Sequence, residues 1–332
     1  MGNVVVYCEG LTKVYGQGRR GAIPVLAVDH INFHVCQGEI FGFLGPNGAG
    51  KTTTINILTT LLQPTEGIAR VMGFDVVRDA YKVREQIGIV PEISNIYEEY
   101  SAWDNLMFTA RLYGIPRLER ERRAKDLLLA FGLWDKRHVL SSGFSKGMKR
   151  RLCLAMGLMH QPRILFLDEP TSGLDIQSVL VIREIMRRLQ EEGVTIFLTT
   201  HNIEEASQIC DRVAIITQGK IAAVDTPENL KSIFRGMQSV EIAFTNGSGI
   251  DEEELKRLPG VRQVRRFGDK WRLYTAAPGQ VIPFVVDWAR ARNLAIASLH
   301  TLGPSLEEVF VQITGLAPSI TQRDSEGEEG VG

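Results

Sequence analysis

Short apolar runs alternate with longer amphipathic stretches along the first two thirds of the chain. The runs are VVVYCEGL from residue 4, INFHV from 31, IFGFLG from 40, ILFLD from 164, TIFLTT from 195 and VAIIT from 213. Runs of this length, rich in β-branched and aromatic residues, are typical of buried strands. Because helical stretches separate them, the pattern predicts an α/β fold in which helices pack on the faces of a sheet.

The pattern starts again as a compact unit after the sequence RGMQS. VEIAF alternates as a strand, IDEEELKRL is expected to be a helix, and VRQVRRF and KWRLYTA are expected to pair around Gly268 and Asp269. A helix near VIPFVVDWARAR, a strand LAIASLHTL and a last helix SLEEVFVQIT follow. This order predicts a split β-α-β domain, a small α+β unit over residues 238–316. Residues 317–332 carry too few apolar groups to fold and are expected to be disordered.

Composition and charge narrow the classes of partner. The chain of 332 residues has a formal net charge of -1, which gives no general attraction to nucleic acid, and no nucleic-acid partner is expected. No charge-poor apolar run approaches the roughly 20 residues that cross a bilayer, so membrane crossing would require another chain. The 4 cysteines form no C-x-x-C pair, and the N-terminus lacks the pattern of a secretory signal. Both features favour reduced thiols in the cytosol.

The stretch GPNGAGKTT follows the predicted strand IFGFL and opens the helical stretch TINILTTLL. In that context glycines allow backbone N–H groups to point at an anion at a helix N-terminus. The lysine reaches the β- and γ-phosphates, and the hydroxyl of the next threonine ligates Mg²⁺. The predicted ligand is therefore a nucleoside triphosphate with Mg²⁺. The predicted binding residues are Gly45, Pro46, Asn47, Gly48, Ala49, Gly50, Lys51, Thr52 and Thr53.

A second acidic motif, RILFLDEP, places Asp168 and Glu169 at the end of a predicted buried strand. Ligands of open α/β sheets bind at the carboxyl ends of the strands. Successive side chains of a strand point in different directions, so one carboxylate can hold a metal while the other polarises water. Asp168 is the predicted Mg²⁺ ligand and Glu169 the predicted general base.

The stretch SSGFSKGMKRRLCLAMGLM begins with turn-forming residues, continues as an apolar helix, and carries four cations near its start. A helix N-terminus is electropositive, so cations there cost a few tenths of a kcal/mol or more. We therefore expect an anion at this position. The cations are Lys146, Lys149, Arg150 and Arg151.

Taken in order, FSKGM before a helix, ILFLDEPTSGLD and TTH resemble the motif set of the ATP-binding domain of ABC transporters. The resemblance covers roughly residues 4 to 235. It implies an ATP-binding domain over residues 1–235, with a helical subdomain at about 93–143. The following unit is similar to the C-terminal extension of the drug-resistance exporter subclass. The resemblance implies a P-loop ATPase that binds ATP and Mg²⁺.

The resemblance also implies roles for single residues. Tyr15 would stack on adenine, Asp175 in SGLD lies in the loop that couples two active sites, and His201 would sense the γ-phosphate. Alternatively, Tyr15 is a half-buried tyrosine at a strand end, and His201 has a structural role.

Two positions depart from the common family pattern. Glu92 stands where the family usually has glutamine; a carboxylate there can ligate Mg²⁺ or accept a water, but it adds negative charge beside phosphates. FSKGM replaces Leu-Ser-Gly-Gly-Gln, yet retains Ser145 and Gly147. In the family these groups contact the γ-phosphate of ATP held by the other subunit. Lys146 and Lys149 are expected to face the same anion.

The function implied is the ATP-hydrolysing subunit of an exporter, acting as a homodimer on a separate transmembrane permease. Its expected location is cytoplasmic, peripheral on the inner face of the cell membrane. One alternative is a soluble ABC ATPase that acts on ribosomes or DNA, although the chain has one P-loop and no sustained heptads. Another is a non-catalytic ATP switch, against which the presence of Glu169 and His201 argues. The sequence does not name the cargo.

Overall fold

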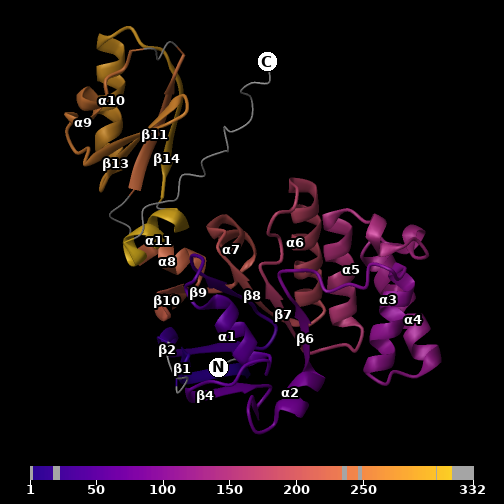
Figure 1. Ribbon diagram of the computed structural model, residues 1–332. Coiled ribbons are helices and arrows are strands. Elements are labelled where there is room, and N and C mark those ends of the chain that lie inside the picture. Colours follow the sequence, from indigo (N-terminus) through magenta and orange to yellow (C-terminus); the bar gives the residue numbers. More distant parts are fainter. Residues whose placement is uncertain (1–2, 18–22, 234–237, 246–248, 304, 316–332) are drawn as a thin grey trace, which may run out of the picture. The chain divides into compact units, whose positions relative to one another are not determined.

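The computed structural model describes residues 3–17, 23–233, 238–245, 249–303 and 305–315. The chain divides into two compact units, Met1–Pro227 and Glu228–Gly332 (Figure 1). The sequence predicted a first domain through residue 235, whereas helix α8 (Pro227–Ile233) begins at the division. The predicted disordered tail, 317–332, lies outside the described residues.

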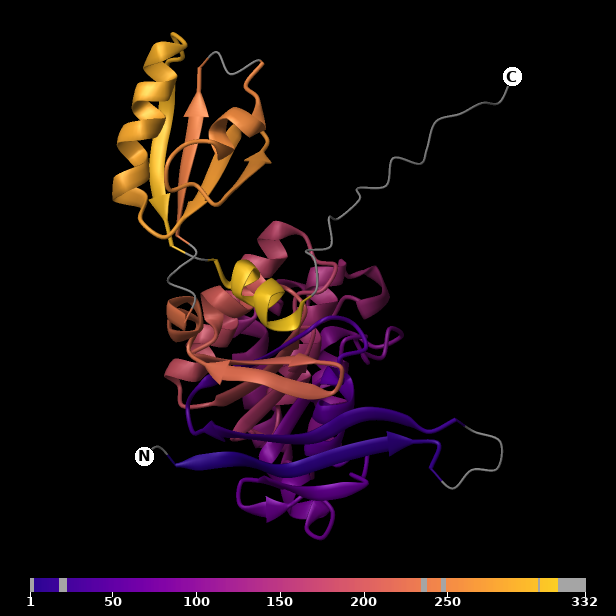
Figure 2. The ribbon, with the colours of Figure 1, turned by 90° about the vertical axis from the view of Figure 1, so that its left-hand side faces the viewer.

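Two sheets form the first unit. The larger sheet is parallel except for the strand at one edge, and the smaller sheet is antiparallel. The larger sheet has the order β10 (Lys220–Asp225), β9 (Arg212–Thr217), β3 (Ile40–Leu44), β8 (Thr195–Thr200), β7 (Ile164–Asp168), β6 (Ile87–Val90). The smaller sheet has the order β2 (Val25–Cys36), β1 (Val4–Tyr15), β4 (Glu66–Val71), β5 (Phe74–Asp75). Strands β1 and β2 run side by side as a long pair (Figure 2).

Burial explains why the central strands are continuous apolar runs. Every residue of β3, β7 and β8 is buried, as expected for parallel strands covered on both faces. The core joins the two sheets through aromatic rings. Phe33 of β2 stacks on Phe41 of β3 with ring centroids 5.8 Å apart, and Phe197 of β8 lies 5.8 Å from Phe41. The predicted α/β fold is confirmed.

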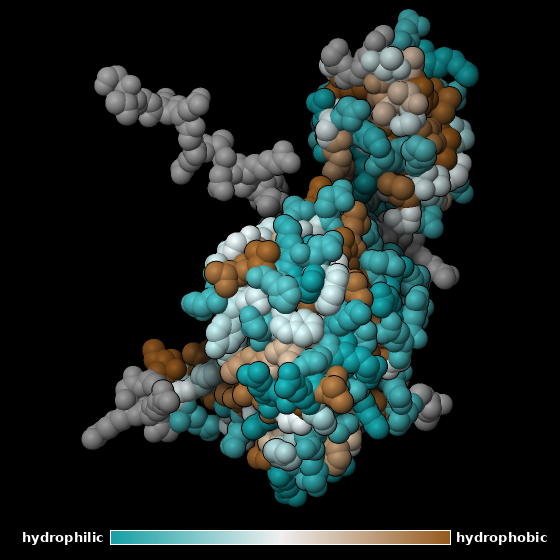
Figure 3. Space-filling model, turned by 90° about the vertical axis from the view of Figure 1, so that its right-hand side faces the viewer, coloured by the Kyte–Doolittle hydropathy of each residue, from teal (hydrophilic) through white to brown (hydrophobic). Residues whose placement is uncertain are grey.

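Helices cover the parallel sheet and form a group at one side. Helix α1 contacts strands of both sheets, α6 and α7 contact β8, and α3, α4 and α5 pack on one another (Figure 1). The side of the unit that faces the viewer in Figure 3 is mostly hydrophilic with scattered apolar patches. The helices are α1 (Lys51–Leu58), α2 (Ala80–Gln86), α3 (Ala102–Leu112), α4 (Arg117–Ala130), α5 (Lys146–Leu158), α6 (Ile176–Glu191) and α7 (Ile203–Ile209), with 3-10 turns Trp134–Lys136 and Ser141–Gly143.

The second unit has the predicted split β-α-β arrangement. Its antiparallel sheet has the order β12-β13-β11-β14, and residues from α9 and α10 join its core (Figure 2). Val240, Ile242 and Phe244 alternate along β11 and pack with Val281 and Val285 of α10. The elements are β11 (Gln238–Phe244), α9 (Glu252–Lys256), β12 (Gln263–Phe267), β13 (Lys270–Thr275), α10 (Pro278–Ala291), β14 (Ile296–Leu302) and α11 (Leu306–Thr314).

Among the helices that the structure describes, none combines the length and the apolar character of a membrane-spanning segment.

Candidate functional site

The phosphate loop connects β3 to α1. Gly48 and Gly50 have φ values of 79° and 105°, conformations that residues with a Cβ rarely adopt. Gly45 is required for a different reason, because a Cβ there would collide with the backbone oxygen of Ile216 on β9. Gly50 is the N-cap of α1, so the loop delivers the positive end of a helix to the carboxyl end of the sheet.

A cavity of about 280 Å³ lies beside this loop. Five segments of the chain contribute to it, and they include both the predicted general base and the histidine that follows β8. Tyr15, Ser145, Gly147, Asp168 and Asp175 are not among the described residues that line it. Its lining consists of Ala27, Asn47, Gly48, Gly50, Lys51, Thr52, Thr53, Glu92, Glu169, Ser172 and His201. The sequence did not single out Ala27 or Ser172.

Lys51 and Glu169 form a buried ion pair in this cavity. Lys51 Nζ lies 3.2 Å from Glu169 Oε1 and donates hydrogen bonds to the carbonyl oxygens of Gly45 (2.8 Å) and Pro46 (3.2 Å). The other carboxylate oxygen, Glu169 Oε2, lies 2.9 Å from Nδ1 of His201. The lysine, the carboxylate and the imidazole thus form one connected polar group.

The backbone of Glu169 is strained. Its φ is 46°, a left-handed conformation that costs a non-glycine residue on the order of 1–3 kcal/mol. The N–H of Glu169 donates to both Oγ1 and the carbonyl oxygen of Thr199 on β8, each at 3.1 Å. The Thr199 hydroxyl in turn donates to Asp168 Oδ1. Thr199 therefore fixes both acidic residues, a role that the sequence did not reveal.

A further buried acid, Glu205, lies behind the site. Its two carboxylate oxygens accept hydrogen bonds from the hydroxyls of Thr171 and Thr200, each at 2.6 Å. Burial raises the pKa of Glu205. The bonds tie the segment after β7 to the end of β8. The two consecutive threonines before His201 indicated that hydrogen-bond acceptors lie nearby. The sequence alone did not show that one of these acceptors is Glu205.

The side chains available to Mg²⁺ are oxygen donors. Thr52 and Glu92 line the cavity, and Asp168 lies at the end of β7 with one oxygen bonded to Thr199. Within the described part of the chain, no three His, Cys, Asp or Glu residues cluster as a metal site of their own. A hydroxyl and two carboxylates fit a hard cation that completes its coordination with nucleotide phosphates.

The four cations of FSKGMKRR separate in the structure. Arg150 is buried and donates to backbone carbonyls, and Arg151 Nη1 donates to the carbonyl of Phe131 at 2.8 Å. Lys149 Nζ lies 2.5 Å from Glu98. The expectation that all four await an anion is wrong for the two arginines, which point into the protein. Lys146 remains exposed, and its ammonium packs on Gly173.

The start of α5 packs on the start of α6. Ser145 is the N-cap of α5 and accepts the N–H of Met148 at 3.3 Å. Gly147 is buried, and a Cβ there would lie 2.8 Å from the Cβ of Ser178. Asp175 is the N-cap of α6, and hydrogen bonds from Ser178 lower the pKa of its carboxyl group.

Tyr15 ends β1 near the phosphate loop. Its hydroxyl lies 3.3 Å from Thr53 Oγ1, and the residue is 39% exposed. Lys13 Nζ lies over the ring, 5.5 Å from its centroid.

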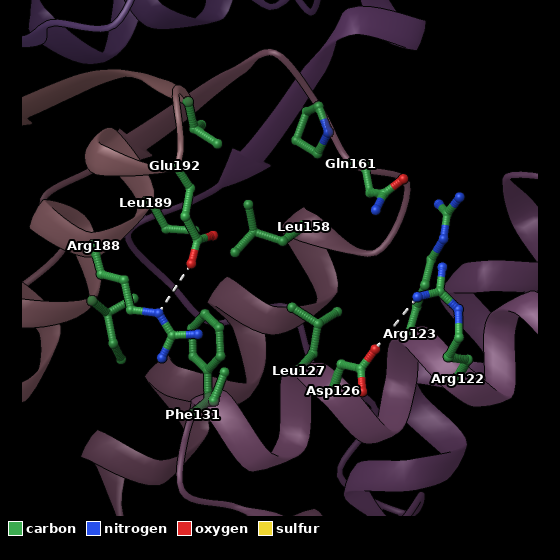
Figure 4. Close-up of a pocket in the computed structure, with 14 residues that line it drawn as sticks. Arg122, Arg123, Asp126, Leu127, Phe131, Leu158, Gln161, Arg188, Leu189 and Glu192 are labelled. Atoms are coloured by element: carbon green, nitrogen blue, oxygen red, sulfur yellow. Dashed lines mark hydrogen bonds and ion pairs between the residues drawn. The ribbon is translucent and has the colours of Figure 1, made fainter.

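A second cavity, of about 350 Å³, lies among α4, α5 and α6 (Figure 4). Two ion pairs lie in its lining: Arg188 with Glu192 at 3.1 Å, and Arg122 with Asp126 at 3.8 Å. It contains none of the predicted site residues, so the phosphate-loop cavity is the candidate functional site.

Comparisons with known proteins agree with this geometry. The profile of the ABC transporter family matches residues 28–172. The chain is 34% identical over 316 residues to the linearmycin resistance ATP-binding protein LnrL of Bacillus subtilis, covering 94% of this chain and 98% of the relative. It is 37% identical over 311 residues to the daunorubicin/doxorubicin resistance ATP-binding protein DrrA of Streptomyces peucetius, covering 92% and 91%.

Solved structures give the same result for the fold. The cbiO1 protein of Clostridium perfringens, part of the cbiONQ transporter complex, superimposes with a TM-score of 0.63 at 28% identity, covering 69% of this chain and 91% of its own. The ATP-binding cassette MJ0796, a dimer in a post-hydrolysis state with ADP and Pi, superimposes with a TM-score of 0.59 at 27% identity, covering 67% and 98%.

Proposed function

This chain belongs to the ABC transporter family as the ATP-binding and ATP-hydrolysing subunit of an exporter, and we propose that two copies close on two ATP molecules to drive a separate permease. One observation carries the proposal. Lys51, Thr52, Glu92, Glu169 and His201 come from separate segments and line one cavity beside a helix N-terminus.

Each group in the cavity has a task in hydrolysis. Lys51 and the backbone N–H groups of the loop bind the phosphates. Glu169 accepts a proton from water as the water oxygen bonds to the γ-phosphorus and the bond to the β-phosphate oxygen breaks, which releases ADP and phosphate. His201, held by Glu169, donates a hydrogen bond toward the γ-phosphate.

Mg²⁺ would be held by Thr52, Asp168 and Glu92 together with phosphate oxygens. When bound, it neutralises part of the charge that develops on the phosphates. The protein residues that hold it also orient the β- and γ-phosphates relative to Glu169.

The motif FSKGM supports a dimer. Ser145 and Gly147 lie at the start of α5 and are not among the described residues that line the cavity of their own chain. They are therefore not placed to contact a phosphate bound in that cavity. We assign them to the ATP of the second copy, whose negative charge would face the N-terminus of α5 and the exposed Lys146. We assign the coupling of the two sites to Asp175, the N-cap of the adjoining α6.

The surface around residues 93–143 is the proposed contact with the permease. Ile93 is 84% exposed, and Tyr97, Tyr100 and Leu140 are each more than 40% exposed. The rings of Tyr97 and Tyr100 lie with centroids 5.6 Å apart. Leu140 forms an isolated antiparallel β-bridge with Ser101, the residue after Tyr100. An apolar group of this kind suits docking to another protein. Such docking would hold the chain on the cytoplasmic face of the membrane.

The cargo is a property of the permease. Relatives at similar identity include proteins named for daunorubicin/doxorubicin resistance and for Nod factor export. Proteins named for such different compounds resemble this chain over almost its whole length, so the shared subunit does not select the compound.

The test is ATP hydrolysis by the full chain and by two variants. The parent should release phosphate from ATP, Lys51→Ala should lose ATP binding, and Glu169→Gln should bind ATP but turn over about 10²-fold or more slowly. A Glu169→Gln variant with the parent rate would remove Glu169 from the reaction.

A further inference from the structure

Arg150 makes an unusually complete set of hydrogen bonds. Its side chain is 3% exposed. Nε donates to the carbonyl of Pro170 at 2.9 Å, and Nη2 donates to those of Asp168 at 2.8 Å and Glu169 at 3.0 Å. Nη1 donates to the carbonyls of Pro91 and Glu92. A guanidinium has five N–H donors, and five carbonyls receive hydrogen bonds from this one.

The five carbonyls belong to the two segments that carry the reactive side chains. Residues 168–170 begin with the last residue of β7 and include the predicted general base. Residues 91–92 follow β6 and include the carboxylate that replaces the usual glutamine. We propose that Arg150 is a positioning residue for ATP hydrolysis, which holds the backbones of Glu169 and Glu92 in the arrangement that hydrolysis requires. This inference rests on the ATPase function proposed above.

The strained conformation of Glu169 explains why its backbone needs support. Its φ is 46°, and its N–H is fixed on one side by Thr199. Its carbonyl is fixed on the other side by Arg150, which also holds the carbonyls of the residues before and after it. A left-handed residue persists when its surroundings determine it on both sides. Without Arg150 the segment can relax, and the carboxylate would move away from the attacking water.

The position of Arg150 on α5 gives the contact a second consequence. Arg150 lies five residues after Ser145, on the helix whose start we assign to the ATP of the second copy. A shift of α5 on contact with that ATP would therefore move the backbone of this chain's own catalytic segment. Arg150 makes no hydrogen bond with Lys51 or Thr52. It should therefore affect turnover and leave phosphate binding nearly unchanged.

The test compares Arg150→Gln and Arg150→Lys with Arg151→Gln in the full chain. Lysine keeps the charge but has three donors, and glutamine has two, so neither can satisfy five carbonyls. Arg151 is the matched control, because it lies on the same helix and donates to the single carbonyl of Phe131. The measurements are kcat, KM, the equilibrium affinity for a fluorescent ATP analogue and the midpoint of thermal unfolding.

Arg150→Gln should lower kcat by roughly 10- to 100-fold, the effect of a small misplacement of a catalytic group. Its affinity for the ATP analogue should stay within about threefold of the parent, as expected for an intact phosphate loop. Arg150→Lys should be intermediate, and Arg151→Gln should keep most of the parent kcat. If Arg150→Gln does not fold, the Lys variant carries the same comparison.

Two results would overturn the inference. One is a parent-like kcat in Arg150→Gln or Arg150→Lys. The other is a loss of ATP affinity that parallels the loss of kcat, which would indicate a purely structural role. The Glu169→Gln variant is measured alongside. If the parent hydrolyses ATP and Glu169→Gln does not, an Arg150 result of either kind leaves the proposed function intact.

Discussion

Lys51 Nζ and Glu169 Oε1 lie 3.2 Å apart, and both side chains are less than 10% exposed. Removal of either partner leaves the other charge in a buried site, which is costly. We expect Lys51→Ala to lower the free energy of unfolding, and Glu169→Gln added to Lys51→Ala to restore part of it. Denaturant unfolding of the two single variants and the double variant measures the coupling, expected at about 0.5–3 kcal/mol. Additive effects would mean that the pair does not contribute to stability.

Glu92 adds a negative charge to the cavity that receives the phosphates. Glu92→Gln keeps a side-chain oxygen that can ligate Mg²⁺ but removes this charge. It should therefore lower the KM for ATP about two- to fivefold, the effect of roughly 0.5–1 kcal/mol of repulsion. Steady-state ATPase assays over a range of ATP concentrations measure the change. Glu99→Gln is the control, because Glu99 is exposed on the same segment and does not line the cavity. An unchanged KM in Glu92→Gln would place this carboxylate away from the phosphates.

Gly147 is closely packed against Ser178. A Cβ at residue 147 would lie 2.8 Å from Ser178 Cβ, so Gly147→Ala should push α5 away from α6 and cost about 1–3 kcal/mol. ATP-dependent dimer formation should fall with it, as measured by size-exclusion chromatography in the Glu169→Gln background. Gly143→Ala is the control, since a Cβ at Gly143 meets no atom within 4 Å. Equal behaviour of the two alanine variants would contradict the packing argument.

His160 should make stability depend on pH. Its Nε2 donates to the carbonyl of Ile87 at 2.8 Å, its ring stacks on Tyr113 with centroids 3.8 Å apart, and its Nδ1 is buried without a partner. Burial lowers the pKa of His160 below the usual 6.5, with a further contribution from Arg123. The unfolded chain then binds a proton at a higher pH than the folded chain does. Stability should therefore fall as pH drops below about 6.5, at up to about 1.4 kcal/mol per pH unit.

The His160→Gln variant keeps a donor for Ile87 but cannot titrate. Chemical denaturation between pH 5 and pH 8, a range set by the ordinary pKa of histidine, should show a smaller pH dependence than in the parent. His34→Gln, a change at an exposed histidine, should retain the parent dependence. If the His160 variant and the parent lose stability equally in acid, the buried imidazole is not the cause.

Much of the fold was predictable because local patterns determine it. Strands β3, β7 and β8 are fully buried, so their sequences are continuous apolar runs. Gly48 and Gly50 have positive φ in the phosphate loop, as the motif requires. Asp104 donates its N–H to Ser101 at the start of α3, the interaction typical of a serine at a helix N-cap.

The sequence did not reveal partners that are distant along the chain. Arg150 contacts carbonyls up to 59 residues away, and backbone carbonyls leave no signature in side-chain sequence. The sequence pattern therefore groups the four cations near the start of the helix, although the helix directs Arg150 inward. The pairing of Glu205 with Thr171, 34 residues away, is hidden because the fold, and not the local sequence, brings the two side chains together.

The central claim is that each ATP site is built from two chains. A Lys51→Ala subunit has a defective phosphate loop and an intact Ser145, and a Ser145→Arg subunit has the reverse. In a heterodimer of the two, the intact phosphate loop of the second subunit faces the intact serine of the first, whereas neither homodimer has such a pair.

The direct measurement is the amount of ATP retained per dimer after rapid gel filtration of mixed, differently labelled subunits. Heterodimers should retain one ATP, and each variant alone should retain almost none. Labelled subunits that pair and still retain no ATP would contradict the central claim, because Ser145 would then not complete the site of a neighbouring chain.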